Sequence, residues 1–424
     1  MTGNAHEADM TQDPDSFAPF DPATLSCPHA YWAALRARAP VKRITVPGND
    51  RPVFLVSRRA DVQAVAMDPA TFSSMVPSDI WRWGDLGPEL QPHLLSQGWG
   101  IVHTIASADP PMHSLYRKIV NGLFLNNKVK ALVPSILSAI DGLIRDIPRD
   151  EPFDFMTKFA IPLPIAMISD MLGLPAADRP RVQRYTDTFV EMVDPSSSPE
   201  QAKAAVSLFA EGQHYLKGFV DRLVANPDDG ILSLVANARN DEGALLSIEE
   251  RLSLCYLLMA AGNETTRNGL ALCAYYLAAR PDLWDALKAD REKVPAFVEE
   301  ALRVGTPAVL NPRLVTRDTE LAGVSIPRDS ICFILWGSAN RDEASFSNAD
   351  QIDLERKAPR NHQAFGYGIH SCVGAPLARQ ELNLSVQAWL DQWESLSFAV
   401  SMSEVSHSPL FGFRSFPELP MRVR

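Results

Sequence analysis

The sequence predicts a mostly α-helical protein with a small region of β-sheet. Apolar residues recur at helical spacing through most of residues 131–230 and again from 248 to 279. Two short segments rich in β-branched residues, 41–44 and 53–57, are separated by a Pro-Gly-Asn-Asp sequence and predict a hairpin. We therefore expect a helical body (α+β overall) with a sheet at one edge.

Composition limits the class of protein. The chain has 424 residues, 46% of them hydrophobic, which is enough for a large core. No internal boundary is visible, so we expect one domain over residues 19–424 and a disordered, polar tail over 1–18. That tail has no basic region followed by an apolar run, so neither a signal peptide nor a membrane anchor is expected. The net charge of −11 disfavours nucleic acid and anionic membranes as partners.

Cysteine usage indicates the compartment. The five cysteines form no CxxC pair and no closely spaced framework, which fits a reducing cytoplasm. We expect a cytoplasmic monomer.

The elements follow in order along the chain. Residues 27–36 have helical periodicity that ends at Ala39-Pro40, just before the hairpin. Residues 72–108 resist regular assignment, and long irregular segments of compact proteins are usually lids or binding loops. Two amphipathic helices, 180–193 and 200–223, flank a loop at 194–199.

The longest predicted helix begins at a capping box, Ser247-Ile248-Glu249-Glu250, and continues to Ala279. A helix of that length spans roughly 48 Å, so it must cross the middle of the protein. Gly262 and Thr265 weaken it near its midpoint, because glycine is a poor helix former and threonine hydroxyls compete for backbone carbonyls. We expect a local bulge there, at a functional site.

The segment 365–376, with the sequence FGYGIHSCVGAP, predicts a tight loop followed by a helix that ends near Trp393. Cys372 lies where this helix begins, and the positive end of the helix dipole favours its thiolate. A thiolate on a glycine-rich loop suits a large planar metal cofactor. The alternative is an ordinary turn with a buried cysteine.

This loop resembles the haem-binding loop of the cytochrome P-450 family. The resemblance rests on seven positions: Phe365, Gly366, Gly368, His370, Cys372, Gly374 and Ala378. It extends over residues 27–424 and implies the cytochrome P-450 fold, with haem b between the long central helix and the Cys loop. It also implies that Cys372 is the axial ligand of the haem iron, with backbone N–H groups near 373–375 bonded to its sulfur.

The same resemblance covers the middle of the long helix, where residues 260–266 are similar to the family's Ala-Gly-x-Glu/Asp-Thr motif. Ala261 would border the groove that receives dioxygen. Cleavage of dioxygen consumes two protons, and a hydroxyl fed by a carboxylate linked to water can supply them. Thr265 is therefore the expected distal hydroxyl and Glu264 the proton relay. The alternative is a core-facing Thr beside a surface Glu.

Further roles are implied by the resemblance. Four basic residues would bind the haem propionates: His113, Arg117, Arg313 and His370. Three residues would hold the Cys loop in place without taking part in catalysis: Glu300, Arg303 and Arg356. Five residues would line a substrate pocket roofed by segment 72–108: Trp81, Trp83, Val309, Leu310 and Phe411. For either Trp, a ring tucked into the core is the alternative.

The function that the resemblance implies is hydroxylation of a hydrophobic small molecule, such as a terpenoid, an aromatic compound, a fatty acid or a steroid. Electrons would come from NAD(P)H through a separate reductase and a ferredoxin. One alternative is a haem-thiolate enzyme that uses peroxide directly or catalyses a rearrangement, although Glu264-Thr265 argues against it. A haem-based sensor is another, although no signalling domain is apparent.

Overall fold

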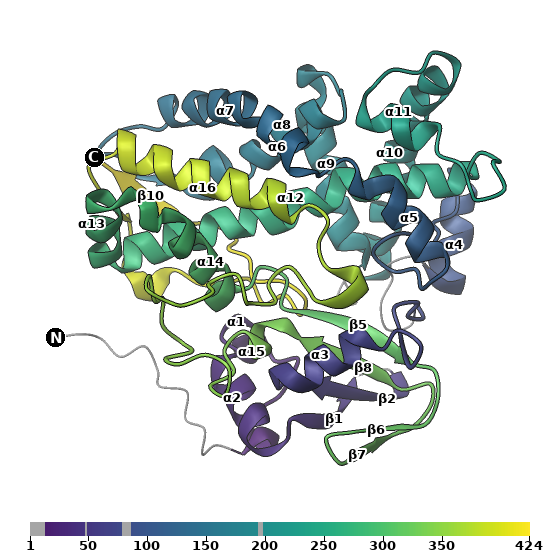
Figure 1. The fold of residues 1–424 in the computed structure, drawn as a ribbon, viewed down its shortest axis with the longest axis horizontal. Helices are drawn as coiled ribbons and strands as arrows, with labels where there is room; N and C mark the ends of the chain where they lie inside the picture. The colour runs from purple at the N-terminus through teal and green to yellow at the C-terminus, as the bar shows by residue number, and fades with distance from the viewer. Residues whose placement is uncertain (1–12, 47–48, 79–85, 194–197) are drawn as a thin grey trace.

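The structure is a computed structural model that describes residues 13–46, 49–78, 86–193 and 198–424. Helices dominate it, and a small sheet lies below them in Figure 1, as the sequence predicts. The α-helices are α1 (Pro22–Ser26), α2 (His29–Arg38), α3 (Arg59–Met67), α4 (Gly87–Leu95), α5 (Met112–Asn121), α6 (Asn126–Ala131), α7 (Val133–Arg145), α8 (Pro162–Met171), α9 (Arg179–Val193), α10 (Pro199–Ala225), α11 (Ile231–Ala236), α12 (Ile248–Ala279), α13 (Pro281–Ala289), α14 (Val294–Gly305), α15 (Trp336–Ala339) and α16 (Ala375–Gln392). The strands are β1 (Val41–Val46), β2 (Asn49–Val56), β3 (Phe72–Ser73), β4 (Phe153–Asp154), β5 (Leu310–Val315), β6 (Thr319–Leu321), β7 (Val324–Ile326), β8 (Ile331–Leu335), β9 (Leu396–Phe398) and β10 (Pro420–Val423).

The main sheet joins distant parts of the chain in the order β1-β2-β8-β5-β3. The predicted hairpin is confirmed, because β1 and β2 pair antiparallel with Val41 opposite Val56. Strand β8 runs parallel to β2 and antiparallel to β5, and all five of its residues are buried. A strand covered on both faces is expected to be continuously apolar, as β8 is.

Helix α12 confirms the predicted central helix and its cap. The Ser247 N–H donates to Glu250 Oε2 at 2.7 Å, and the Glu250 N–H donates to Ser247 Oγ at 3.1 Å. The helix contacts α8, α9, α10, α14 and α16, so it crosses the helical body (Figure 1). The expected bulge is wrong: α12 is α-helical throughout. Thr265 Oγ1 donates to the Ala261 carbonyl at 3.1 Å without interrupting the helix.

Segment 72–108 is more regular than predicted. It contributes β3, whose Phe72 pairs with Val315, and helix α4. Pro88 is compatible with this helix because it occupies the first turn, where proline is well tolerated. Trp81 and Trp83 lie outside the described residues.

The predicted amphipathic pair agrees with the structure. It is α9 and α10, although residues 194–197 of their connection lie outside the described part.

Part of the predicted N-terminal tail is ordered. The Phe17 ring lies 5.2 Å from that of Tyr31 in α2, so this end of the tail contacts the body. Among the helices that the structure describes, none has both the length and the apolar composition needed to cross a bilayer.

The core explains where a site can form on α12. Residues 252–260 pack into one large apolar cluster and residues 270–277 into another, so the two halves of the helix are buried in different clusters. Between them, Ala261 and Gly262 are exposed and Thr265 is half-buried. The middle of an otherwise buried helix is therefore accessible on one face.

Candidate functional site

The Cys372 loop is closed by a backbone hydrogen bond from the Cys372 N–H to the Phe365 carbonyl at 2.8 Å. Gly366 and Gly368 have φ angles of 72° and 73°, in the region that favours glycine. A Cβ at Gly368 would also lie 2.5 Å from the Ala66 carbonyl oxygen of α3, so the loop packs closely against that helix. Helix α16 begins at Ala375, directly after the loop.

The thiol of Cys372 is subject to opposing effects. Its side chain is accessible to solvent, yet surrounding protein atoms raise its pKa by burial. The N–H groups of Gly374 and Ala375 and the nearby cations Arg117 and Arg379 act in the opposite direction. The helix start thus favours the thiolate as expected, but it does not outweigh burial. A metal ion on the sulfur would provide the additional positive charge.

His370 of this loop meets His113 of α5. The rings of His113 and His370 are 4.4 Å apart at an interplanar angle of 62°. His370 Nε2 lies 2.9 Å from Ser74 Oγ, and His370 Nδ1 lies 3.2 Å from the Ile105 carbonyl oxygen. His113 Nε2 is buried without a hydrogen-bond partner in the described part of the chain. The pair therefore retains an unused nitrogen.

Arg313 adds a buried cation to the two histidines. Burial lowers its pKa to about 10, and Asp109 opposes this effect. Its Nη1 donates to the neighbouring Pro312 carbonyl at 2.8 Å. Burial, followed by the charges of Arg313 and His113, lowers the pKa of His370 to about 3. Arg117 lies nearby and donates to the Ser371 carbonyl of the loop. This basic cluster (His113, Arg117, Arg313 and His370) has the charge and the free donor needed to bind an anion.

Glu264 is buried, so the alternative of a surface Glu is wrong. It forms an ion pair with Arg267, and Asn268 Nδ2 donates to its Oε1 at 2.9 Å. Arg267 also contacts Asp187 of α9 at 2.9 Å. Burial raises the pKa of Glu264, and the charge of Arg267 opposes that shift. Its carboxylate is therefore engaged away from Thr265 in this conformation.

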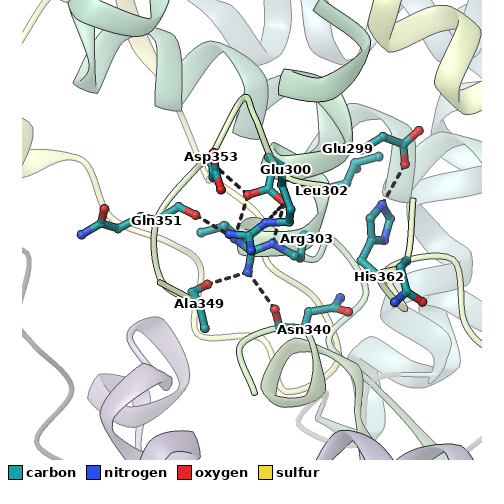
Figure 2. A network of polar contacts seen from close by, with 12 residues as sticks. Glu299, Glu300, Leu302, Arg303, Asn340, Ala349, Gln351, Asp353 and His362 are labelled. Atoms are coloured by element: carbon teal, nitrogen blue, oxygen red, sulfur yellow. Dashed lines mark hydrogen bonds and ion pairs between the residues drawn. The ribbon is translucent and has the colours of Figure 1, made fainter. Parts of the chain in front are cut away.

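The predicted structural trio, Glu300, Arg303 and Arg356, comes together at α14. Figure 2 shows Arg303 at the centre of a polar network in which its Nε and Nη2 donate to the two Glu300 oxygens at 2.7 and 2.9 Å. Arg356 Nε donates to Glu300 Oε1 at 2.8 Å. Arg303 also donates to three backbone carbonyls outside its own helix, at Asn340, Ala349 and Gln351. This side chain thus joins α14 to the chain that leads to the Cys loop.

Sequence reasoning missed Glu299, which points away from Glu300 toward His362 in Figure 2. Its carboxylate accepts from Arg379 Nε at 2.6 Å and lies 2.8 Å from His362 Nε2. Burial alone would raise the pKa of Glu299, but the hydrogen bonds from His362 and Arg379 lower it to about 2. Arg379 also lies over the Phe365 ring, 4.3 Å from its centroid. The available signal was the adjacent pair Glu299-Glu300.

Of the five predicted pocket residues, the structure describes Val309, Leu310 and Phe411, and these pack in the apolar cluster on the main sheet. Val309 and Leu310 are buried, and the Val309 N–H donates to the Gly412 carbonyl at 3.0 Å. The Phe411 ring packs 4.9 Å from that of Phe333. The structure thus brings the 309–310 and 411 segments together.

Comparison with known proteins gives consistent matches. The family model described as Cytochrome P-450 matches residues 153–407. The chain is 33% identical to the cytochrome P-450 monooxygenase PikC of Streptomyces venezuelae, over 94% of this chain and 91% of that protein. It is 31% identical to the vitamin D(3) 25-hydroxylase of Pseudonocardia autotrophica, over 93% and 94%. The solved structure of cytochrome P-450 CREJ with (4-ethylphenyl) dihydrogen phosphate has a TM-score of 0.87 at 27% identity, over 97% of this chain and all of that one.

Proposed function

The chain belongs to the cytochrome P-450 family and is a monooxygenase, and from this premise we propose that it hydroxylates a hydrophobic small molecule at haem held by Cys372. The observation that carries the proposal is the accessible thiol in a glycine loop beside a basic cluster in which His113 and Arg313 are buried. The overall reaction is R–H plus O₂, two electrons and two protons, giving R–OH and water.

The residues present fit haem b. Arg313 and His113 Nε2 have hydrogen-bonding capacity that an anion can satisfy. The two propionates of haem are such anions. We assign Arg117 and His370 to the same groups, and Phe365, Gly366, Gly374 and Ala261 to contact with the macrocycle. Haem bound there supplies an iron that activates dioxygen.

Thr265 and Glu264 are the residues to which we assign proton transfer. Thr265 Oγ1 donates to the Ala261 carbonyl, lies on the accessible face of α12 and can also accept a hydrogen bond. Glu264 would hold the next proton, which requires that its carboxylate first leave Arg267 and Asn268. The assignment of Thr265 is supported by this geometry and by the family motif, and that of Glu264 by the motif and its burial.

We assign the electron supply to NAD(P)H through a reductase and a ferredoxin. Lys118 of α5 is exposed and suits an acidic partner, whereas Arg117 and Arg379 donate to internal acceptors. The five cysteines are free, which fits the reducing cytoplasm proposed as the compartment. A monomer stays our expectation.

The substrate proposal remains at the level of a hydrophobic small molecule. Val309, Leu310 and Phe411 are apolar, and one relative is named as a hydroxylase of vitamin D(3), an apolar molecule. We keep Trp81 and Trp83 as candidate lining residues. Terpenoid, aromatic, fatty-acid and steroid substrates all fit this class.

The test is turnover of a hydrophobic panel by the haem-loaded protein with NADH, ferredoxin, a reductase and ¹⁸O₂. We expect one ¹⁸O atom in the product and product formation that depends on ferredoxin. Full-rate turnover with peroxide and none with ferredoxin would favour the peroxide-using alternative. A protein that binds haem but forms no product with any compound or donor would favour the sensor.

A further inference from the structure

Arg414 is a second buried cation, away from Cys372. Its side chain is 6% exposed, and its Nη1 donates to the Ser26 carbonyl at the end of α1 at 2.9 Å. Its Nε is buried and has no hydrogen-bond partner among the described residues. Burial lowers the pKa of Arg414 to about 10. A buried charge without a counter-charge is costly, so this site is incomplete as the described chain forms it.

Comparison with the other buried arginines shows that Arg414 lacks a counter-charge among the described residues. Arg36, Arg303 and Arg341 each form an ion pair with a carboxylate, from Glu343, Glu300 and Asp350 respectively. Arg59 donates to both oxygens of Asn361. Arg313 and Arg414 each donate to a single backbone carbonyl. The proposed function gives Arg313 a haem propionate as its counter-charge, and Arg414 is left without one.

Two histidines beside Arg414 also have unused ring nitrogens. Nδ1 of His29 and Nδ1 of His407 are buried without a hydrogen-bond partner in the described chain. Burial and then the charge of Arg414 lower the pKa of His407 to about 2, so its ring is neutral. Burial, followed by Arg341 and Arg414, also lowers the pKa of His29. A neutral imidazole can carry its proton on Nδ1 and donate it.

The start of α2 adds further donors. His29 is the first residue of α2, and Pro28 before it provides no side-chain cap. The first N–H groups of a helix have no intrahelical acceptor, and their partial positive charge favours an anion. The hydrogen bond from Arg414 to the Ser26 carbonyl places the guanidinium three residues before His29, near the start of α2. A buried guanidinium, two ring nitrogens and a helix start are therefore close together.

We propose that Arg414, His29 and His407 form a binding site for a small inorganic oxyanion, phosphate or sulfate, at the start of α2. The ion would supply the counter-charge that Arg414 lacks and accept hydrogen bonds from both rings. An inorganic ion fits better than a phosphorylated metabolite, because the unpartnered ring nitrogens are enclosed. Both histidine side chains are only half-buried, so rotation about their side-chain bonds can admit the ion.

The site would also have a structural effect. Arg414 joins the C-terminal segment to α1, and the backbone N–H of Arg414 donates to the Pro307 carbonyl at 2.8 Å. An ion bound to Arg414 and to the start of α2 would connect the two ends of the chain. Binding to the folded state alone raises stability with ligand concentration.

The experiment measures the thermal unfolding midpoint of the haem-loaded protein against sulfate concentration, at constant ionic strength. Haem loading keeps the Arg313 cluster filled, so that it does not bind the added ion. The variants are Arg414→Gln and, as a matched control, Arg328→Gln, whose side chain is 70% exposed. We expect a saturable rise for the wild type and for Arg328→Gln. In Arg414→Gln the apparent affinity should fall roughly tenfold to a hundredfold.

Without sulfate, Arg414→Gln should be at least as stable as the wild type, because it removes an uncompensated buried charge. His407→Phe, which keeps a ring beside Phe416, is the second variant and should weaken sulfate binding severalfold. Two results would overturn the proposal. One is a saturable response retained in both Arg414→Gln and His407→Phe. The other is a rise in the wild type that stays linear in sulfate, as general exclusion of sulfate from protein surfaces would give.

Discussion

At the scale of single residues, burial of the Cys372 thiol opposes the thiolate form that its proposed role as an iron ligand requires. Burial raises the pKa of its thiol, whereas an iron ligand must be a thiolate. Arg117, Arg379 and two backbone N–H groups lower the cost of the negative charge. The same logic applies to Arg313, a buried cation beside the loop that lacks a full counter-charge. Both residues are better explained with haem bound than without it.

Arg313→Gln should separate haem binding from folding. In the haem-free protein we expect no loss of stability, because the substitution removes a buried charge that is poorly compensated. Haem binding should weaken roughly tenfold to a hundredfold, the usual effect of losing a hydrogen bond to a charged group. Haem titration of the apoprotein and urea unfolding measure the two quantities. Unchanged haem affinity would contradict the role of Arg313.

Thr265→Ala should lower the yield of product per NAD(P)H consumed by about tenfold or more, with the missing electrons recovered as hydrogen peroxide. The reason is loss of the hydroxyl on the accessible face of α12. Thr266→Val is the control, because Thr266 is buried and lies on another face. Equal yields for Thr265→Ala and the wild type would remove Thr265 from proton transfer.

At the scale of elements, the sequence predicts the two ends of α12 correctly but predicts a bulge that the helix does not have. Its cap and its end are local signals, and both are confirmed. The bulge was wrong because propensity alone suggested it, whereas packing of both halves of the helix in apolar clusters keeps α12 regular. Helix α4 is absent from the prediction because segment 72–108 shows no regular pattern, although Pro88 falls in the first turn of the helix, where proline is well tolerated.

The packing of α14 against α16 explains the residue that the sequence did not reveal. Adjacent side chains on a helix point in different directions, so Glu299 and Glu300 meet separate sets of basic partners. The partners of Glu299 come from α16 and from His362, which are distant in sequence. Only the folded chain brings them together. The roles assigned to individual site residues remain predictions.

The low pKa of Glu299 predicts how stability depends on pH. Its folded-state value of about 2 lies below the ordinary 4.5, so its contribution is present above pH 4.5 and is lost as the pH falls toward 2. That difference corresponds to about 3 kcal/mol. We expect Glu299→Gln to lower the free energy of unfolding at pH 7 and to flatten its decline between pH 5 and 2. Urea unfolding across that range measures both.

The control for this measurement is Glu355→Gln, because the Glu355 side chain is 74% exposed in its pair with Lys293. Its pH dependence should match that of the wild type. A Glu299→Gln profile that is also parallel to the wild type would contradict the account of the α14–α16 contact.

On the scale of the whole molecule, Arg303 joins α14 to the chain that leads to the Cys loop. It donates to Glu300 on its own helix and to carbonyls at Asn340, Ala349 and Gln351. These contacts fix the chain that leads from the sheet to the Cys loop (Figure 2). That residues 19–424 form one domain, with a tail before it, stays a prediction.

Arg303→Lys should therefore destabilise the entire protein. Lysine keeps the charge but cannot reproduce the planar set of donors, which leaves buried acceptors unpaired. We expect the free energy of unfolding to fall by about 3 kcal/mol or more. Arg360→Lys is the matched control, since the Arg360 side chain is 73% exposed and lies 3.4 Å from Glu299. Its effect should stay below about 0.5 kcal/mol. Equal stabilities of the two variants would contradict the role of Arg303.

The most direct test of the central claim is the absorption spectrum of the reduced, haem-loaded protein with carbon monoxide. If Cys372 binds the haem iron as a thiolate, the Soret band of the wild type will be strongly red-shifted. The Cys372→His variant will lack that shift. An ordinary Soret band in the wild type, or a red-shifted band retained in Cys372→His, would contradict the assignment of Cys372.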